Sequence, residues 1–393
     1  MTNPPLRSFR AENFEAIRDS GRIEFGWLTA FIGNNGAGKS SLVEALETFR
    51  DVVQDGVDRG FQRWRGFEHA LNQAPKRTLS KSLAERSRFT HPMQFSSHWR
   101  WKGKDLRCQQ SITQGEQDTL FIQSEQVVRR QLGLTERWIR NSHGDVYVNG
   151  EWQEGNGKKV ANPPKLADGS SMLNQFAWES FADWQFLMLN PERMGQPTPQ
   201  KRAMNVVTLA RDGANIAEYL NEIRKLDRSA FEGIVDSLRI VLPYAANLTP
   251  SFTSELERAF YLKLEEEDFG IPGWLLSTGT LRIVALLAAL RHPKPSPLMV
   301  VEEIENGLDP RTLHLLVEEI RAAITAGTTQ VILTTHSPYL LDLLDLSQIV
   351  VVEREAGEPV FRRPDAEQLA DWSKSFSPGR LYTMGRLTPG DHP

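Results

Sequence analysis

The chain has 393 residues, of which 40% are hydrophobic and 24% charged, and a formal net charge of -4 at pH 7. This composition is ordinary for a globular protein and gives no global signal for nucleic-acid binding. Cys108 is the only cysteine, which excludes an internal disulfide and a cysteine-rich metal site. The longest apolar run, residues 283–290, is too short to span a membrane, and no signal peptide is recognisable, so we expect a cytoplasmic protein without membrane contact.

The first part of the chain predicts short strands, a glycine-rich loop and a helix. Residues 6–11 and 22–25 have the composition of strands, and we expect them to form a sheet edge beside the loop. Residues 28–32 read LTAFI, as in a buried parallel strand. Apolar residues then recur at helical spacing, at Leu42, Leu46, Phe49 and Val53.

The loop between this strand and this helix reads G-x-x-x-x-G-K-[ST], the pattern of a phosphate-binding loop. Glycines let the backbone approach phosphate oxygens, and the helix N-terminus offers unpaired N–H groups. Lys39 is expected to reach the β- and γ-phosphates, and Ser40 to ligate Mg²⁺. An accidental glycine loop with a surface lysine is the alternative. The predicted nucleotide-binding residues are Gly33, Asn34, Asn35, Gly36, Ala37, Gly38, Lys39, Ser40 and Ser41.

Residues 59–104 concentrate positive charge in a chain that is acidic elsewhere. They hold 11 Lys or Arg against Glu68 and Glu85, a balance of +9, with aromatic residues interspersed. Basic and aromatic side chains together favour phosphate backbones and exposed bases, so one interpretation is contact with DNA. The other is a solvated face over an ordinary core, with the rings buried. The aromatic residues are Phe61, Trp64, Phe67, Phe89, Phe95, Trp99 and Trp101.

The remaining chain predicts a β-rich part, a helical part and a return to α/β alternation. Residues 94–148 alternate in short runs bounded by Gly and Asp, which predicts an antiparallel meander. Two apolar stripes, at 216–226 and 231–238, predict helices. After Gly273, alternating strands and helices predict a parallel sheet with helices on its faces, into which the middle of the chain is inserted. The helices are expected at 280–291, 311–323 and 339–343, and the strands at 298–301, 331–334 and 349–352.

Two carboxylates, Glu302 and Glu303, follow the apolar strand at 298–301. A charge at the end of a buried strand needs a cation or a hydrogen-bonding partner, and Mg²⁺ bound to nucleotide phosphates provides one. We assign Glu302 to the metal and Glu303 to the attacking water of phosphoryl transfer to water. Without the loop upstream, the pair would also fit a solvated acidic strand end.

Two further polar stretches lie where additional phosphate contacts are expected. Ser277 and Gly279 open the helix at 280–291, and their hydroxyl and N–H groups lie at its positive end. Simple helix capping is the alternative for this stretch. His336 follows the strand at 331–334, so a parallel sheet carries it to the edge that holds the glycine-rich loop. An imidazole there can contact the γ-phosphate, whereas a purely structural histidine is the alternative.

The order of these stretches matches a known set of motifs. GNNGAGKSS, LSTGT, VVEEIENGLD and TTHSP resemble, in sequence and order, the Walker A, signature, Walker B with D-loop, and switch-histidine motifs of ABC-type ATPases. Within these the chain resembles the RecF/SMC/OLD-like group of AAA ATPases. The resemblance is strong over residues 6–53 and 275–352, about a third of the chain, with a weaker echo at residues 212–215, which read DGAN.

The resemblance implies an ATPase that uses ATP and Mg²⁺ in a head-to-tail homodimer, with each ATP between two subunits. Under it, Ser277 and Gly279 contact the nucleotide of the partner subunit. Asp309 lies in the D-loop, and His336 contacts the γ-phosphate. Glu303 and His336 are then the catalytic candidates, and Ser40 and Glu302 the metal ligands.

The chain departs from the family pattern at several positions. Glu302 stands where an aspartate is usual, Ile304 where proline is common, and Glu15 where relatives often carry a basic residue. No coiled-coil heptads follow the loop, and residues 353–393 are too few for an OLD nuclease domain, so we expect neither an SMC arm nor an appended nuclease. The Q-loop glutamine stays open among Gln94, Gln109, Gln110 and Gln114.

We therefore expect an α/β P-loop NTPase with an ABC-like head and an inserted antiparallel β and helical lobe. The ATPase core comprises 1–58 and 270–393, the basic segment and meander 59–160, and the helical lobe 161–269. The favoured function is ATP hydrolysis coupled to DNA-linked work, either repair or anti-phage defence. The alternative is an ATP-dependent sensor or scaffold that holds and releases a separately encoded effector protein without binding nucleic acid.

Overall fold

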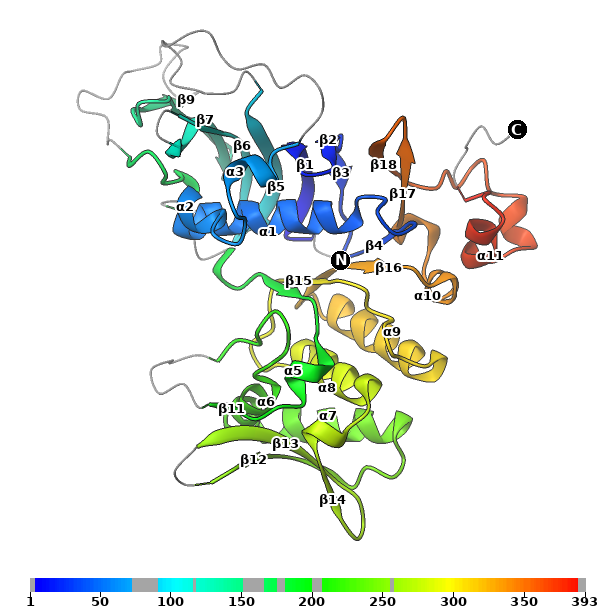
Figure 1. Cartoon of the computed structure of the whole chain (residues 1–393). Coiled ribbons are helices and arrows are strands. Elements are labelled where there is room, and N and C mark those ends of the chain that lie inside the picture. The colour runs from blue at the N-terminus through cyan, green and yellow to red at the C-terminus, as the bar shows by residue number, and fades with distance from the viewer. Residues whose placement is uncertain are drawn as a thin grey trace.

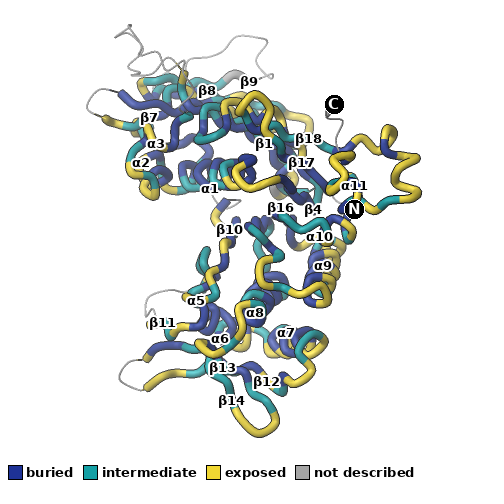
Figure 2. Tube along the Cα trace, turned by 45° about the vertical axis from the view of Figure 1, so that its right-hand side comes forward, coloured by how far each residue is buried: buried dark blue, intermediate teal, exposed yellow. Residues whose placement is uncertain are grey.

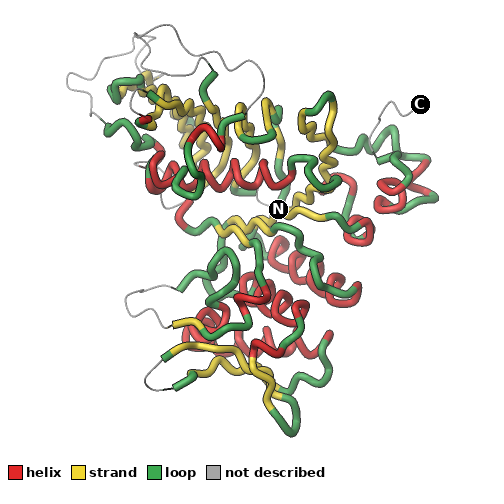
Figure 3. The backbone as a smooth tube through the Cα atoms, viewed as in Figure 1, coloured by secondary structure: helices red, strands yellow, loops and turns green. Residues whose placement is uncertain are grey.

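A computed structural model describes residues 4–72, 91–115, 118–150, 166–174, 181–199, 207–254 and 258–387. The described strands form three sheets, and helices lie mainly beside the central one (Figures 1 and 3). The α/β class and P-loop architecture predicted from the sequence are confirmed.

The central sheet is mostly parallel and has the strand order β10-β15-β16-β4-β17-β18, in which only β18 runs antiparallel. β4 lies in the middle, between β16 and β17, so three predicted strands from distant parts of the chain meet here. The strands are β10 (Gln185–Leu187), β15 (Leu298–Val301), β16 (Gln330–Thr335), β4 (Leu28–Ile32), β17 (Ile349–Glu355) and β18 (Glu358–Arg362).

The second sheet is antiparallel and contains the predicted meander. The first two strands of the chain also belong to it, because β1 pairs with β5 through six residue pairs, and β2 and β3 pair with β1. The sheet that these first strands join is therefore the antiparallel sheet, and the central sheet that carries the glycine-rich loop does not include them. The strands are β1 (Leu6–Phe14), β2 (Ile17–Asp19), β3 (Ile23–Glu24), β5 (Met93–Trp101), β6 (Lys104–Gln114), β7 (Leu120–Gln131), β8 (Leu134–Arg140) and β9 (Val146–Gly150).

The central sheet separates two hydrophobic cores, because successive side chains of a strand point to opposite faces. Leu28, Ala30 and Ile32 of β4 face a core built with helices of the second half of the chain. Phe31 faces the other core, in which α1 packs against the antiparallel sheet. Figure 1 shows α1 running between the two sheets, and Figure 2 shows both interiors buried.

The predicted helices are present: one has the predicted bounds, 216–226, two extend beyond the predicted ranges 231–238 and 311–323 at both ends, and the other two begin one or two residues earlier than predicted. The region 161–269 is not purely helical: it contributes β10 to the central sheet and carries a third, small sheet of β11 (Thr198–Pro199), β12 (Asn247–Phe252), β13 (Ala259–Glu265) and β14 (Gly270–Pro272). The helices are α1 (Lys39–Asp55), α2 (Val57–Gly60), α3 (Phe67–Ala70), α5 (Pro191–Met194), α6 (Ile216–Leu226), α7 (Arg228–Val241), α8 (Thr278–Leu290), α9 (Pro310–Thr325), α10 (Pro338–Asp342) and α11 (Pro378–Thr383).

No helix among the described residues combines the length and the apolar character needed to cross a membrane.

Candidate nucleotide site

The N-terminus of α1 is built to receive an anion. β4 ends at Ile32, and α1 begins at Lys39 after a loop whose last residue, Gly38, is the N-cap with φ 113°. Glycine has no side chain to cap the helix, and no side chain takes its place. By contrast, α8 and α9 are capped by the side chains of Ser277 and Asp309. The first N–H groups of α1 therefore keep the donor capacity that phosphate binding requires.

Two glycines of the loop are required by close packing. A Cβ atom on Gly33 would lie 2.1 Å from the carbonyl oxygen of Val352 in β17, and one on Gly38 would lie 2.6 Å from Cγ of Pro359 in β18. A side chain at either position would push the loop away from β17 and β18. Gly36 has φ +74° and open space around it, so its requirement is conformational.

Lys39 is buried, and its ammonium group lies inside the loop. Nζ donates hydrogen bonds to the carbonyl oxygens of Gly33 at 2.7 Å and Asn34 at 3.0 Å. Burial lowers the pKa of Lys39, and the nearby carboxylates of Glu303 and Glu305 act against this shift. The loop thus holds a desolvated cation at the predicted position of the phosphates.

Glu302 lies directly after β15 and is 6% exposed. Its Oε1 accepts a hydrogen bond from Nη2 of Arg211 at 3.0 Å, and the Ser40 hydroxyl also hydrogen-bonds its carboxylate. Burial raises the pKa of Glu302, while Arg211 and Ser40 lower it. The two predicted metal ligands, Ser40 and Glu302, are therefore in contact, although they are far apart in the sequence.

Glu303 is held in a left-handed backbone conformation, with φ 48°. Its amide donates to Oγ1 of Thr334 at 2.9 Å, and its carboxylate accepts a hydrogen bond from the side-chain amide of Asn306. Such backbone conformations are unfavourable for residues with side chains and recur at functional sites. Here it turns the chain sharply after Glu302, so that consecutive carboxylates have different partners.

His336 follows β16, which pairs with both β4 and β15. Since the three strands are parallel, their carboxyl ends lie at one edge of the sheet, where His336 joins the loop and the two carboxylates. The backbone N–H of His336 donates to the carboxylate of Glu305, a residue that the sequence analysis did not single out.

The predicted signature residues serve helix capping within the subunit. The Ser277 hydroxyl accepts from the amide of Thr280 at 3.1 Å. A Cβ on Gly279 would lie 2.3 Å from the carbonyl oxygen of Gly307, so glycine is needed where α8 meets the segment before α9. Asp309 accepts from the Thr312 hydroxyl at 2.6 Å, and this hydrogen bond lowers the pKa of Asp309.

Arg211 is a second residue of this site that the sequence did not predict. Besides Glu302, its guanidinium pairs through Nε with the buried carboxylate of Glu47 on α1, at 3.3 Å. The DGAN stretch at 212–215 holds it there: Gly213 has φ +74°, and Asn215 accepts from the amide of Ala210 at 2.7 Å. The stretch was visible in the sequence, but the arginine before it has no motif of its own.

The basic segment is only partly described, because residues 73–90, including Lys76 and Arg77, lie outside the described residues. In the described part, Arg63 bonds to the Glu47 carboxylate and to the Glu44 carbonyl oxygen. The aromatic rings of Phe61, Phe67, Phe95 and Trp99 are all buried. These rings are core residues and are not available for stacking on bases.

The four glutamines considered for the Q-loop lie on β5 and β6 of the antiparallel sheet: Gln94, Gln109, Gln110 and Gln114. β15 pairs with β16 on one side and with β10 on the other, and the segment after β10, residues 188–193, contains no glutamine. This segment lines a cleft of about 880 Å³ together with Arg211, Arg282 and Thr278. Arg282 donates to the carbonyl oxygen of Leu189 at 2.9 Å and so ties α8 to this segment.

Residues 181–342 match the family model described as "AAA domain, putative AbiEii toxin, Type IV TA system". The match covers β10, the DGAN stretch, the LSTGT and VVEEIENGLD stretches and His336, whereas the glycine-rich loop at 33–41 lies outside it. Residues 181–342 are therefore similar to the AAA domains that this family model describes. No curated protein matches this chain.

Solved structures of SMC heads align with most of this chain. One, bound to the C-terminal winged-helix domain of ScpA, is 12% identical over 93% of this chain and 99% of its own, with a TM-score of 0.48. The head from Thermotoga maritima is 13% identical over 92% and 99%, with a TM-score of 0.41. A third, with an extended coiled coil and bound to a ScpA domain from Pyrococcus furiosus, is 12% identical over 94% and 99%, with a TM-score of 0.47.

The residues at this edge fit a nucleotide with one Mg²⁺. The uncapped α1 terminus and buried Lys39 suit phosphates, and the Ser40–Glu302 pair offers two oxygen ligands. Among the described residues, no group of three or more His, Cys, Asp or Glu side chains is arranged to hold a metal by itself. This agrees with Mg²⁺, which usually takes one or two protein ligands and completes its shell with phosphates and water.

Proposed function

We propose that the protein hydrolyses ATP to ADP and phosphate at the carboxyl edge of the central sheet. The observation that carries this proposal is the convergence of the uncapped α1 terminus, buried Lys39 and the Ser40–Glu302 contact on one edge. Each part has another use alone, but together they match the needs of a triphosphate and its metal.

The chain's own residues have separable roles in this reaction. Lys39 exchanges its two carbonyl partners for phosphate oxygens, and the first N–H groups of α1 bind the same phosphates. Ser40 and Glu302 would hold Mg²⁺, which, when bound, neutralises charge on the phosphate oxygens. Glu303, fixed by Thr334 and Asn306, orients the attacking water and accepts its proton. His336 contacts the γ-phosphate from the end of β16.

Arg211 positions the metal ligand. Its guanidinium pairs with the carboxylates of Glu47 on α1 and Glu302 after β15. Arg211 therefore fixes the distance between α1 and Glu302. A hydrogen bond to a ligating carboxylate orients that carboxylate and preserves its charge.

The exposed signature segment supports a sandwich homodimer. Within one subunit, Ser277 and Gly279 belong to α8, whereas the phosphate loop belongs to β4 and α1. We propose that the N-terminus of α8 and Asp309 complete the nucleotide site of the partner subunit. Sedimentation with ATP tests this: dimers should accumulate when hydrolysis is blocked.

Lys39→Ala tests the proposed site directly. Loss of the buried ammonium should abolish measurable ATP binding in calorimetry and leave the thermal unfolding of the ligand-free protein within a few degrees of wild type. Lys374→Ala is the matched control, since Lys374 is exposed and forms its ion pair, as far as the structure describes the chain, with Asp371 at 2.8 Å. Wild-type ATP affinity in the Lys39→Ala protein would refute the site.

We propose DNA-linked work, in repair or anti-phage defence, as the task of the ATPase cycle. The supporting feature is the positive balance of residues 59–104. We would measure the affinity for DNA at near-physiological salt, with and without ATP. If the two sites are coupled, ATP should change the free energy of DNA binding by about 1–3 kcal/mol. A variant with Arg65, Lys76 and Arg77 changed to Ser should lose the binding. Unchanged affinity in all conditions would contradict this task.

The second candidate is an ATP-dependent module that holds and releases a separately encoded effector. Two observations favour it: the rings of Phe61, Phe67, Phe95 and Trp99 in the basic segment are buried, and the matched family description names a toxin of a toxin–antitoxin system. Co-purification of a neighbouring gene product that ATP releases, without DNA, would support this candidate.

A further inference from the structure

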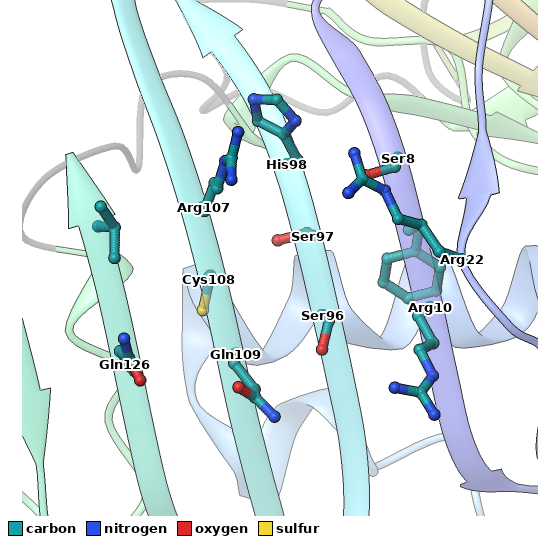
Figure 4. A pocket seen from close by; sticks show the side chains of 12 residues that line it. Ser8, Arg10, Arg22, Ser96, Ser97, His98, Arg107, Cys108, Gln109 and Gln126 are labelled. Atoms are coloured by element: carbon teal, nitrogen blue, oxygen red, sulfur yellow. The ribbon is translucent and has the colours of Figure 1, made fainter. Parts of the chain in front are cut away.

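The antiparallel sheet carries a polar cleft of about 380 Å³ on the face away from α1 (Figure 4). Phe9 of β1 packs against Phe49 of α1, so its neighbours Ser8 and Arg10 point to the opposite face. None of the described residues that line the cleft carries a carboxylate. Its lining contains three arginines with hydroxyl and amide groups: Arg10, Arg22, Arg107, Ser8, Ser96, Ser97, Gln109 and Gln126.

Two guanidinium groups and an imidazole converge at one end of the cleft. In Figure 4, Arg107 and Arg22 lie on either side of His98. Nε of Arg22 lies 2.7 Å from Glu24, whereas the carboxylate contact of Arg107, to Asp105, is 4.0 Å long. Within the described part of the chain, the terminal N–H groups of both arginines have no protein acceptor.

His98 gives independent support for a ligand. It is 7% exposed, and its Nε2 lies 3.0 Å from Oδ2 of Asp105. Its Nδ1 is buried and has no hydrogen-bond partner among the described residues. A buried ring nitrogen without a partner is unfavourable, and a ligand in the cleft provides that partner.

The charges around the cleft favour a small anion that makes direct hydrogen bonds over a large surface with many negative charges. Asp19, Glu24 and Asp105 lie beside the cleft and pair with its arginines or with His98, so they cancel much of the positive field at a distance. What remains is a set of short-range N–H and O–H donors. Guanidinium groups match phosphate oxygens in pairs, and hydroxyl groups add further donors.

We propose that this cleft binds a single phosphate group of a phosphate ester, at the end where Arg22, His98 and Arg107 converge. The ester is either a free nucleotide or one phosphate of a nucleic-acid backbone. The cleft is separate from the ATP site, so the proposal stands independently of ATP hydrolysis.

Fluorescence anisotropy with two probes tests the proposal: labelled AMP and a short labelled DNA duplex. Both are measured on the full chain with Lys39→Ala in every variant, because this change should empty the proposed ATP site, whereas saturating ATP is itself a phosphate ester and would compete for the cleft. Changing Arg22 and Arg107 together to Ser should weaken binding by roughly tenfold or more. The matched control changes Arg130 and Arg137 to Ser, which removes the same charge from exposed positions on β7 and β8 outside the cleft.

Each outcome decides the question. A selective loss in the cleft variant supports the site, and the probe that shows it identifies the source of the phosphate. No binding of either probe to the Lys39→Ala protein with an intact cleft, or equal losses in cleft and control variants, would overturn the proposal. Should the double variant unfold, the single Arg107→Ser protein, with its exposed side chain, replaces it in the same comparison.

Discussion

Replacing Arg211 with glutamine removes the charge that lies between the carboxylates of Glu47 and Glu302. The two ion pairs measure 3.3 Å and 3.0 Å, and the carboxylates are 5% and 6% exposed. Removing one partner of a fully buried pair costs about 3–5 kcal/mol. Arg211 is itself 38% exposed, and Arg63 still pairs with Glu47, so we expect the free energy of unfolding to fall by about 1–3 kcal/mol.

The effect on the metal should be larger than the effect on ATP alone. Partners that hydrogen-bond a metal ligand typically change metal affinity by about 10- to 100-fold. We therefore expect Arg211→Gln to weaken ATP binding by roughly this factor, about 1.4–2.8 kcal/mol, in the presence of Mg²⁺. With EDTA the loss should stay below about threefold.

Calorimetric titration with ATP, once in the presence of Mg²⁺ and once with EDTA, gives the two affinities to be compared. Arg193→Gln is the control, because Arg193 lines the same cleft but pairs with Asp212 at 2.6 Å. Arg211→Lys keeps the charge but cannot span both carboxylates, so its affinity should lie between wild type and Arg211→Gln. If Arg211→Gln lost equal ATP affinity with and without Mg²⁺, Arg211 would not position the metal ligand. Its effect would then come from its positive charge alone. Wild-type protein that shows no Mg²⁺ dependence would refute the metal assignment as well.

Glu303→Gln should retain ATP and Mg²⁺ binding but lose hydrolysis, so that ATP-bound dimers accumulate in ultracentrifugation; a strictly monomeric protein would contradict the sandwich arrangement. Glu302→Gln should instead lose the Mg²⁺-dependent part of ATP affinity in calorimetry, and full retention of that part would exclude Glu302 as a ligand. Burial, the charge of Glu15 and a hydrogen bond to it raise the pKa of Glu44 from 4.5 to about 8. Because the folded state then holds a proton that the unfolded state releases, stability falls as pH rises from 4.5 to 8. Glu44→Gln should remove this fall and raise Tm by at least roughly 2 °C at pH 8 but not at pH 4.5, and the same Tm gain at both values would contradict the shared proton.

Local sequence was sufficient for the phosphate loop and its neighbours. A run of apolar residues, a glycine-rich turn and an amphipathic stripe predicted β4, the loop and α1, since each depends on contacts within a few residues. The strand Leu298–Val301 was predicted with its observed bounds. Parallel strands then placed His336 at the edge that carries the loop, because β16 pairs with β4.

The sheet that the first strands join depended on a distant pairing. β1 has the alternation of any half-buried strand, and nothing within it distinguishes β5 from the central sheet as a neighbour. β1 joins the antiparallel sheet because it pairs with β5, which lies beyond residues 73–90 in the sequence. The contact between the rings of Phe9 and Phe95, 5.9 Å apart, accompanies this pairing. For the same reason β10, a strand of three residues, was hidden in a region expected to be helical.

The sequence by itself determined the class of this protein, because phosphate loops and strand-end carboxylates depend on residue types at fixed spacing. Only the tertiary structure decided how the charges are paired. Arg211 and Glu302 are 91 residues apart, and Glu47 lies on another helix, yet one guanidinium serves both carboxylates. Two buried carboxylates require a nearby cation, but the sequence offers 46 Lys and Arg. Which of them comes within 3.0 Å is set by how the turn before α6 packs against the carboxyl end of β15.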